Sequence, residues 1–304
     1  MNSAVACQEG EADAVGGLLG TLPNFIVIGA AKAGTTWIYE QLKRHPQVYM
    51  PRLKELRYFA FEPDNPQHQA KVGKDYTVTT WQEYLEQFQG AAGAVAIGEA
   101  SPGYLTSEHA ARGIAQSLPK AKLIVSLRNP ADRCYSAYLM SVRAGEEKRD
   151  FDEVIAQGGR CITNSFYCDN VRRYISLFSR EQIKIVLFDE LTGDERGTLR
   201  NLLKFLEVDD GWRPGDSVAK NPGGIPRSAL LHQALHNRSR RLGVVGRYVP
   251  ARLRTYARLL REANLKKAPS MKESARRKLC ELYEPDILRL QDLIGMDLSS
   301  WLKI

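Results

Sequence analysis

Cysteine is scarce in this chain and follows no recognisable pattern. The 304 residues contain five cysteines, an odd number at scattered positions. Such spacing matches neither a disulfide framework nor a zinc site. Free thiols in a reducing compartment are the simplest interpretation.

Long hydrophobic runs are also lacking. No stretch of ~20 consecutive apolar residues occurs, which argues against a membrane-spanning helix. Residues 1–20 carry acids and no basic start followed by an apolar run, so they do not resemble a signal peptide. We expect residues 1–22 to form a flexible tail, residues 23–304 to form a single domain, and the protein to be cytoplasmic.

Acidic residues are in the minority, and one segment accounts for the imbalance. The net charge is +8, and residues 227–267 hold eleven Lys and Arg against one acid, Glu262. Interleaved leucines and tyrosines make this basic segment amphipathic, which is consistent with a membrane surface or an acidic partner. The alternative is a helical flap that packs on the core and lends positive potential to an anionic ligand.

Short apolar runs alternate with helical patterns along most of the chain. The predicted strands are 24–28, 95–97, 123–127 and 183–188, and the predicted helices are 35–44, 107–117, 132–143, 169–178 and 272–293. Continuously apolar strands that alternate with helices indicate a parallel sheet covered on both faces. The expected fold is therefore α/β, a P-loop-like three-layer fold with a helical C-terminal region. Ligands bind beyond the carboxyl ends of such strands, so functional residues should follow Ile28, Ile97, Leu127 and Phe188.

The first strand is followed at once by a loop suited to an anion. Gly29-Ala-Ala-Lys32-Ala-Gly34-Thr35-Thr36 has small residues that let backbone amides wrap around a phosphate at the start of the next helix. A P-loop kinase or NTPase would place the lysine directly before the Ser or Thr. Here the lysine lies two positions before Gly34, which weakens that alternative. Asp189, after the last strand, could still imitate a magnesium-binding aspartate.

A second candidate element follows the strand 123–127. Arg128 stands at its carboxyl end, and Ser136 lies two turns into the next predicted helix. Arg128 can bind a phosphate with its planar fork, and Ser136 can offer a hydroxyl to the same anion. A structural ion pair of Arg128 with Asp132 or Glu99 is the alternative. Arg133 is expected to be a charge on the helix surface.

The motif Ala-Lys32-Ala-Gly34-Thr35-Thr36-Trp37 resembles the 5′-phosphosulfate loop of sulfotransferases that use 3′-phosphoadenosine-5′-phosphosulfate (PAPS). The stretches 98–104 and 118–133 resemble the heparan sulfate branch and its bacterial relatives, and 282–301 resembles bacterial sulfotransferases. The resemblance covers residues 23–301. It implies that Lys32, Ala33, Gly34, Thr35, Thr36 and Trp37 contact the donor and that Arg128 and Ser136 hold its 3′-phosphate. No metal is implied.

The same resemblance implies a general base. In that branch a glutamate of a Lys-Glu-Pro-His-Phe-Phe type motif takes the acceptor proton, and the matching stretch here is Lys54-Glu55-Leu56-Arg57. Glu55 falls on the base position, while Leu56 and Arg57 replace the proline and the histidine. Glu99 is a rival base or a charge partner of Arg128.

The resemblance implies two further residues of the expected site. Tyr167 lies where the family has a tyrosine near the nucleotide, with a core aromatic as the alternative. Arg227 follows Pro222-Gly-Gly-Ile-Pro in a late loop comparable to one that closes over PAPS. The expected activity is transfer of the sulfuryl group from PAPS to a hydroxyl or amine of a glycan, glycolipid or small molecule, with Lys32 and Glu55 as catalytic residues. A further alternative is a basic module that binds nucleic acid or lipid. If the protein is a sulfotransferase, no nucleic acid partner is expected.

Overall fold

The computed structural model describes residues 22–214, 225–226, 265–266 and 268–303. These residues group into two compact units. The first unit holds residues up to Arg128 and Asn170–Val218, and the second holds Asn129–Asp169 and Ala219–Ile304. The expectation of a single domain from 23 to 304 stays a prediction.

A five-stranded parallel sheet forms the centre of the first unit. Its strands are β1 (Phe25–Gly29), β2 (Val48–Tyr49), β3 (Ala96–Ala100), β4 (Lys122–Leu127) and β5 (Ile183–Leu187). Their order is β2-β3-β1-β4-β5, and β1 lies between β3 and β4 with Phe25 opposite both Gly98 and Lys122. All five residues of β1 and of β3 are buried, which agrees with a sheet covered on both faces.

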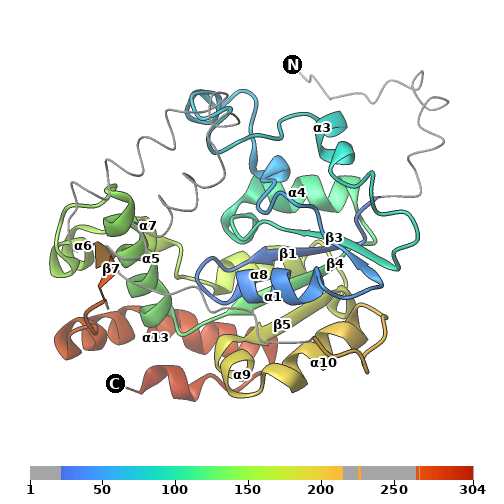
Figure 1. Ribbon diagram of the computed structural model, residues 1–304. Coiled ribbons are helices and arrows are strands. Elements are labelled where there is room, and N and C mark those ends of the chain that lie inside the picture. The colour runs from blue at the N-terminus through green and yellow to red at the C-terminus, as the bar shows by residue number, and fades with distance from the viewer. Residues whose placement is uncertain (1–21, 215–224, 227–264, 267, 304) are drawn as a thin grey trace. The chain divides into compact units, whose positions relative to one another are not determined.

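Helices cover both faces of this sheet and give the expected three layers. On one face, apolar side chains of α1 (Thr35–Leu42) and α10 (Glu195–Phe205) form a core with Phe25 and Val27 of β1. The other face is covered by α3 (Trp81–Glu86), α4 (Glu108–Ser117) and the short 3-10 helices η2 (Tyr58–Ala60) and η3 (Tyr104–Thr106). Figure 1 shows α4 and α10 on opposite sides of the strands. The predicted α/β class is confirmed.

The remaining elements of the first unit are short. They are α2 (Pro66–Gln69), α8 (Cys168–Ile175), which begins two residues before the unit, the 3-10 helix η4 (Arg180–Gln182) and α9 (Phe188–Gly193). Because α9 starts one residue after β5, its first residues stand at the carboxyl edge of the sheet.

The second unit is mainly helical. It contains α5 (Pro130–Ala144), α6 (Phe151–Gln157), α7 (Arg160–Thr163), a strand pair of β6 (Ile225–Pro226) and β7 (Leu265–Lys266), α13 (Glu273–Ile294) and the 3-10 helix η6 (Ser299–Leu302). α13 packs against α5 and α6 and confirms the predicted C-terminal helix within one residue at each end. None of the described helices is long and apolar enough to cross a membrane.

Candidate functional site

The loop between β1 and α1 has the backbone geometry of an anion cradle. Lys32 and Gly34 both adopt positive φ angles, 73° and 87°. Gly34 is the N-cap of α1, where no side chain caps the first turn and no acidic residue lies in it. Within α1 and its cap no acidic side chain therefore compensates the positive end of the helix dipole, which favours a bound anion.

Glycine is required at position 34 for two reasons. A Cβ atom there would lie 3.1 Å from Leu191 Cδ1 and 3.2 Å from Phe188 Cδ2, both in α9. Its φ of 87° also lies in the left-handed region, which disfavours any other residue. The close approach of α9 thus fixes the shape of the loop.

Strand β4 holds the loop from the other side. The backbone N–H of Ala30 donates to Ser126 O at 2.7 Å, and the Ser126 hydroxyl donates to Ala33 O. Ser126 is fully buried within β4. These bonds keep the loop open beside the carboxyl end of β4, where Arg128 follows.

Arg128 lies directly against the loop. Its guanidinium donates to Lys32 O at 3.4 Å and stands 4.6 Å above the ring centre of Phe188. The structure thereby brings together Lys32, Gly34 and Arg128 at one edge of the sheet. Thr35 is buried and Thr36 is half-buried at the start of α1, next in the chain after the loop. Two cations and an uncapped helix start give this edge a positive potential.

The other half of the expected 3′-phosphate element lies in the second unit. Asn129 caps α5 by accepting hydrogen bonds from the N–H groups of Ala131 and Asp132 at 3.0 and 3.3 Å. Ser136 is half-buried on this helix. Its contact with a phosphate stays a prediction.

Arg133 is not the surface charge that the sequence suggested. Its side chain is buried, with 5% of its surface exposed, and donates to Cys161 O at 3.2 Å and to Ser165 Oγ at 3.1 Å. The physical reason is that α5 is covered by α7, so this face of α5 is internal. The packing of α7 on α5 could not be predicted from a single sequence.

Glu55 stands at the carboxyl end of β3. Its backbone N–H donates to Ala100 O at 3.0 Å, and the N–H of Arg57 donates to Ser101 Oγ at 3.1 Å. The carboxylate accepts hydrogen bonds from Lys54 Nζ at 3.1 Å and Arg57 NH2 at 2.6 Å and keeps 34% of its side-chain surface exposed. Burial alone would raise the pKa of Glu55, but the two cations outweigh it and lower the pKa below its ordinary value. Glu55 is therefore ionised and reachable.

Glu99 has a different environment. It lies within β3 rather than after it, and 1% of its surface is exposed. Its oxygens accept from the hydroxyls of Tyr84 and Tyr104 at 3.0 Å each and of Ser101 at 2.7 Å. Burial raises the pKa of Glu99 to about 7 although the three hydroxyls oppose the shift. The expectation that Glu99 pairs with Arg128 is wrong, because hydroxyls and no cation bind it among the described residues.

Tyr167 lies in the second unit, and its contact with the nucleotide stays a prediction. There 1% of its surface is exposed and its ring lies 6.3 Å from that of Trp301. Its backbone N–H donates to Asp286 Oδ2 at 2.6 Å. This environment favours the core-aromatic alternative. Arg227 and most of the basic segment 227–267 lie outside the described residues.

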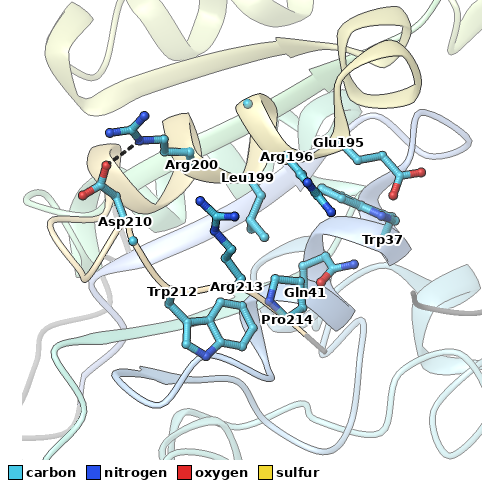
Figure 2. A pocket seen from close by; sticks show the side chains of 12 residues that line it. Trp37, Gln41, Glu195, Arg196, Leu199, Arg200, Asp210, Trp212, Arg213 and Pro214 are labelled. Carbon is cyan, nitrogen blue, oxygen red and sulfur yellow. Dashed lines mark hydrogen bonds and ion pairs between the residues drawn. The ribbon is translucent and has the colours of Figure 1, made fainter. Parts of the chain in front are cut away.

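A cavity of about 720 Å³ opens beside α1, one turn beyond the loop. Figure 2 shows Trp37 and Gln41 of α1 on one wall and Arg196 and Arg200 of α10 on another. Residues 210–214 close a third side, and Trp212 there packs edge-on against His45 with ring centres 4.9 Å apart. The lining also carries the carboxylates of Glu195 and Asp210, and Arg200 Nε donates to Asp210 Oδ2 at 2.9 Å. Trp37 was predicted to contact the donor, whereas the cavity itself left no signal in the sequence.

The magnesium-binding alternative for Asp189 stays a prediction. Asp189 is exposed in the first turn of α9. No group of three or more His, Cys, Asp or Glu side chains that could hold a metal ion occurs in the part of the chain that the structure describes.

Comparison with known proteins decides the family. A model described as "Sulfotransferase domain" matches residues 22–217, more than half of the chain. The chain belongs to the sulfotransferase family. The predicted resemblance is thereby confirmed, and the loop of this sulfotransferase, with Lys32 and Gly34, lies inside the matched range.

Similar proteins include a heparan sulfate enzyme and a bacterial one. The mouse protein named bifunctional heparan sulfate N-deacetylase/N-sulfotransferase 4 is 26% identical over 93% of this chain and 31% of its own length. The Dictyostelium discoideum protein named membrane-associated sulfotransferase kil1 is 35% identical over 42% of this chain and 25% of its own. The crystal structure of a sulfotransferase from Alicyclobacillus acidocaldarius superposes with a TM-score of 0.70 and 28% sequence identity. The match covers 93% of this chain and 99% of the crystallised chain. The chain thus spans about a third or less of the curated relatives' length.

Proposed function

We propose that this sulfotransferase moves the sulfuryl group of PAPS to a hydroxyl or amine of an acceptor by in-line displacement and releases 3′,5′-diphosphoadenosine. The observation that carries the proposal is the loop of Lys32 and Gly34 at the uncapped start of α1, with Arg128 bonded to it. Backbone amides and the helix dipole would hold the 5′-phosphate there. Arg128 would hold the 3′-phosphate, and the contact of Ser136 with it stays a prediction.

Trp37 and the cavity support a nucleotide rather than a bare phosphate. The indole lies on the first turn of α1, and its cavity of about 720 Å³ is within the range of small-molecule sites. We propose that the adenine ring stacks on Trp37. Thr35 and Thr36 would add hydroxyls to the phosphate contacts.

Sulfuryl transfer depends on the positioning of donor and acceptor and on electrostatic stabilisation more than on covalent catalysis. Sulfuryl transfer resembles phosphoryl transfer in that charge spreads over equatorial oxygens and grows on the leaving group. The Lys32 ammonium would neutralise the charge that develops on the bridging oxygen of the departing diphosphate. No metal is needed for this step.

Glu55 is the base that the geometry favours. It is ionised, one third exposed and attached to the end of β3. Each carboxylate oxygen accepts one hydrogen bond, from Lys54 or from Arg57, and so keeps a lone pair for the acceptor proton. A base of this kind contributes ~10²- to 10⁴-fold. Glu99 is a poor candidate, because it is buried and its oxygens are occupied by three hydroxyls.

The acceptor is proposed as a glycan amine or hydroxyl. The support comes from the name of the mouse relative, an N-sulfotransferase of heparan sulfate. Arg57, which replaces the family's histidine beside Glu55, sets this chain apart, and a glycolipid or small-molecule acceptor is compatible with the same chemistry. A cytoplasmic location and a membrane or acidic partner for the basic segment 227–267 stay predictions.

Transfer of radiolabelled sulfate from PAPS tests the proposal. The acceptors are a de-N-sulfated heparan-type polysaccharide, its N-acetylated form and a simple phenol. We expect label on at least one acceptor with the wild type and with Glu86→Gln, an exposed carboxylate on α3. Loss of ~10²-fold or more is expected for Lys32→Ala and for Glu55→Gln. Unchanged transfer by both variants would contradict the assignment.

A further inference from the structure

Glu55 belongs to a short segment, residues 55–59, with an unusual backbone. Glu55 and Arg57 both have positive φ angles, 62° and 57°, although neither is a glycine. A left-handed conformation is unfavourable for residues with a Cβ atom and persists only where the surroundings impose it. With the backbone in this shape, Arg57 Nη2 donates to Glu55 Oε2 at 2.6 Å. The conformation of the segment therefore decides where the carboxylate of Glu55 lies.

Two side-chain hydroxyls fasten this segment to the end of β3 and to η3. The backbone N–H of Arg57 donates to Ser101 Oγ at 3.1 Å, and that of Phe59 donates to the Tyr104 hydroxyl at 3.4 Å. Ser101 and Tyr104 are both fully buried. Bulk water does not reach these hydrogen bonds, so the loss of either hydroxyl would leave a backbone N–H without its acceptor.

Glu99 sets the direction of both hydroxyls. The Ser101 hydroxyl donates to Glu99 Oε2 at 2.7 Å, and the Tyr104 hydroxyl donates to Glu99 Oε1 at 3.0 Å. A hydroxyl has one proton and two lone pairs, so a hydroxyl that donates to the carboxylate presents its lone pairs to other donors. The buried carboxylate thus makes both hydroxyls acceptors for the N–H groups of segment 55–59. A connected network of this kind can fix a single arrangement of the backbone.

We propose that Glu99, acting through Ser101 and Tyr104, positions the general base Glu55 and is not itself the base. The proposal rests on the proposed function, in which Glu55 takes the acceptor proton. Glu99 orients the two hydroxyls, the hydroxyls hold the left-handed segment, and the segment holds the Glu55 carboxylate against Arg57. With 1% of its surface exposed, Glu99 is a positioning residue rather than a catalytic one.

A titration of Glu55 tests this link without donor or acceptor. In NMR spectra of the full chain with isotope-labelled glutamate, the carboxyl signal reports the pKa of Glu55, and Glu55→Gln identifies that signal. Against the raising effect of burial, Lys54 and Arg57 hold this pKa below its ordinary value in the wild type. In Ser101→Ala the segment loses an anchor and the guanidinium is released from the carboxylate. The pKa of Glu55 should therefore rise towards its ordinary value.

Ser107→Ala is the matched control for this titration. The Ser107 hydroxyl also accepts a backbone N–H at 3.1 Å, that of Ala110 in the first turn of α4. The control variant therefore loses the same kind of hydrogen bond as Ser101→Ala, but outside the network around Glu99. We expect the pKa of Glu55 in Ser107→Ala to equal that of the wild type.

A double-mutant cycle shows whether the network works through Glu55. Transfer from PAPS to the de-N-sulfated polysaccharide is measured at pH 8, above the pKa of about 7 of Glu99. We expect Ser101→Ala to lower kcat by ~10-fold or more with the affinity for 3′,5′-diphosphoadenosine unchanged, but to add less than ~3-fold in the Glu55→Gln background. Glu99→Gln should show the same pattern, because the amide of glutamine donates to Ser101 and turns that hydroxyl's proton away. A general weakening of the fold would lower the rate equally in both backgrounds.

Two results would overturn the proposal. One is a pKa of Glu55 in Ser101→Ala that equals the wild-type value, and the other is an equal loss of kcat in the wild-type and Glu55→Gln backgrounds. Tyr104→Phe, which removes the other hydroxyl and keeps the ring, repeats both measurements should Ser101→Ala fail to fold. Full transfer by Glu55→Gln would instead contradict the proposed function, and the titration distinguishes the two failures because it needs no transfer.

Discussion

Replacement of Glu99 by glutamine should change how stability depends on pH. Glu99 is buried in β3 among three hydroxyls, and its pKa lies at about 7 instead of 4.5. As pH rises from 5 to 8, the unfolded chain releases this proton first, while the folded chain holds it until pH 7. The raised pKa therefore stabilises the fold at low pH relative to high pH, and the advantage is lost as pH rises towards the folded pKa.

The size of the effect follows from the two pKa values. The difference between 4.5 and about 7 corresponds to about 3 kcal/mol in total, of which about 2 to 3 kcal/mol falls between pH 5 and pH 8. Glutamine keeps the shape of the protonated carboxyl and an oxygen that accepts from tyrosine, but it does not titrate. Glu99→Gln should thus gain about 2 to 3 kcal/mol relative to the wild type when the pH is raised from 5 to 8.

Urea unfolding at pH 5 and pH 8 measures this difference. Fluorescence suits the assay, since Trp81 stacks on Tyr84 at 5.3 Å between ring centres and Tyr84 binds Glu99. Glu86→Gln, an exposed carboxylate on the same helix as Tyr84, is the matched control and should change the pH dependence by less than about 0.5 kcal/mol. If Glu99→Gln and the wild type respond alike to pH, Glu99 is not the buried, high-pKa group described here.

Two further predictions concern the site. Gly34→Ala should cost about 1 to 3 kcal/mol of stability in thermal unfolding and abolish bisphosphate binding, because a Cβ would meet Leu191 at 3.1 Å with φ at 87°. The control is Gly73→Ala, because Gly73 has a φ of 76° and open space around it. This variant should be less stable than the wild type but should still bind the bisphosphate. Equal binding by both variants would refute the role of the loop. Arg57→Gln removes a cation that lowers the pKa of Glu55, so activity at pH 5 relative to pH 7 should fall below the wild-type ratio. A pH profile identical to the wild type would count against Glu55 as the base.

The layered fold was predictable because its signals are local. Continuous apolar runs mark β1, β4 and β5, and the small-residue loop after β1 can be recognised from the sequence alone. β2 has two residues and gave no periodicity to detect. β3 was predicted too short, since its last residues include Glu99, whose burial depends on hydroxyls that distant segments supply.

The site was predictable only in part, for the same reason. Lys32, Gly34 and Arg128 follow strands whose carboxyl ends meet, and the structure brings them together. The pairing of Glu55 with Arg57 was missed, as was the burial of Arg133, because both depend on how segments pack rather than on which residues they contain. Phe188 and Ser126, which position Arg128 and the loop, carried no charge or motif that would single them out.

Calorimetric titration with 3′,5′-diphosphoadenosine, in parallel with ATP, tests the central claim most directly. The account predicts tight binding of the bisphosphate and weak binding of ATP by the wild type. Arg128→Ala should lose the preference for the 3′-phosphate, whereas Arg112→Ala, an exposed arginine on α4, should keep it. Equal affinity of the wild type for both nucleotides would contradict the claim that this loop and Arg128 form a PAPS site.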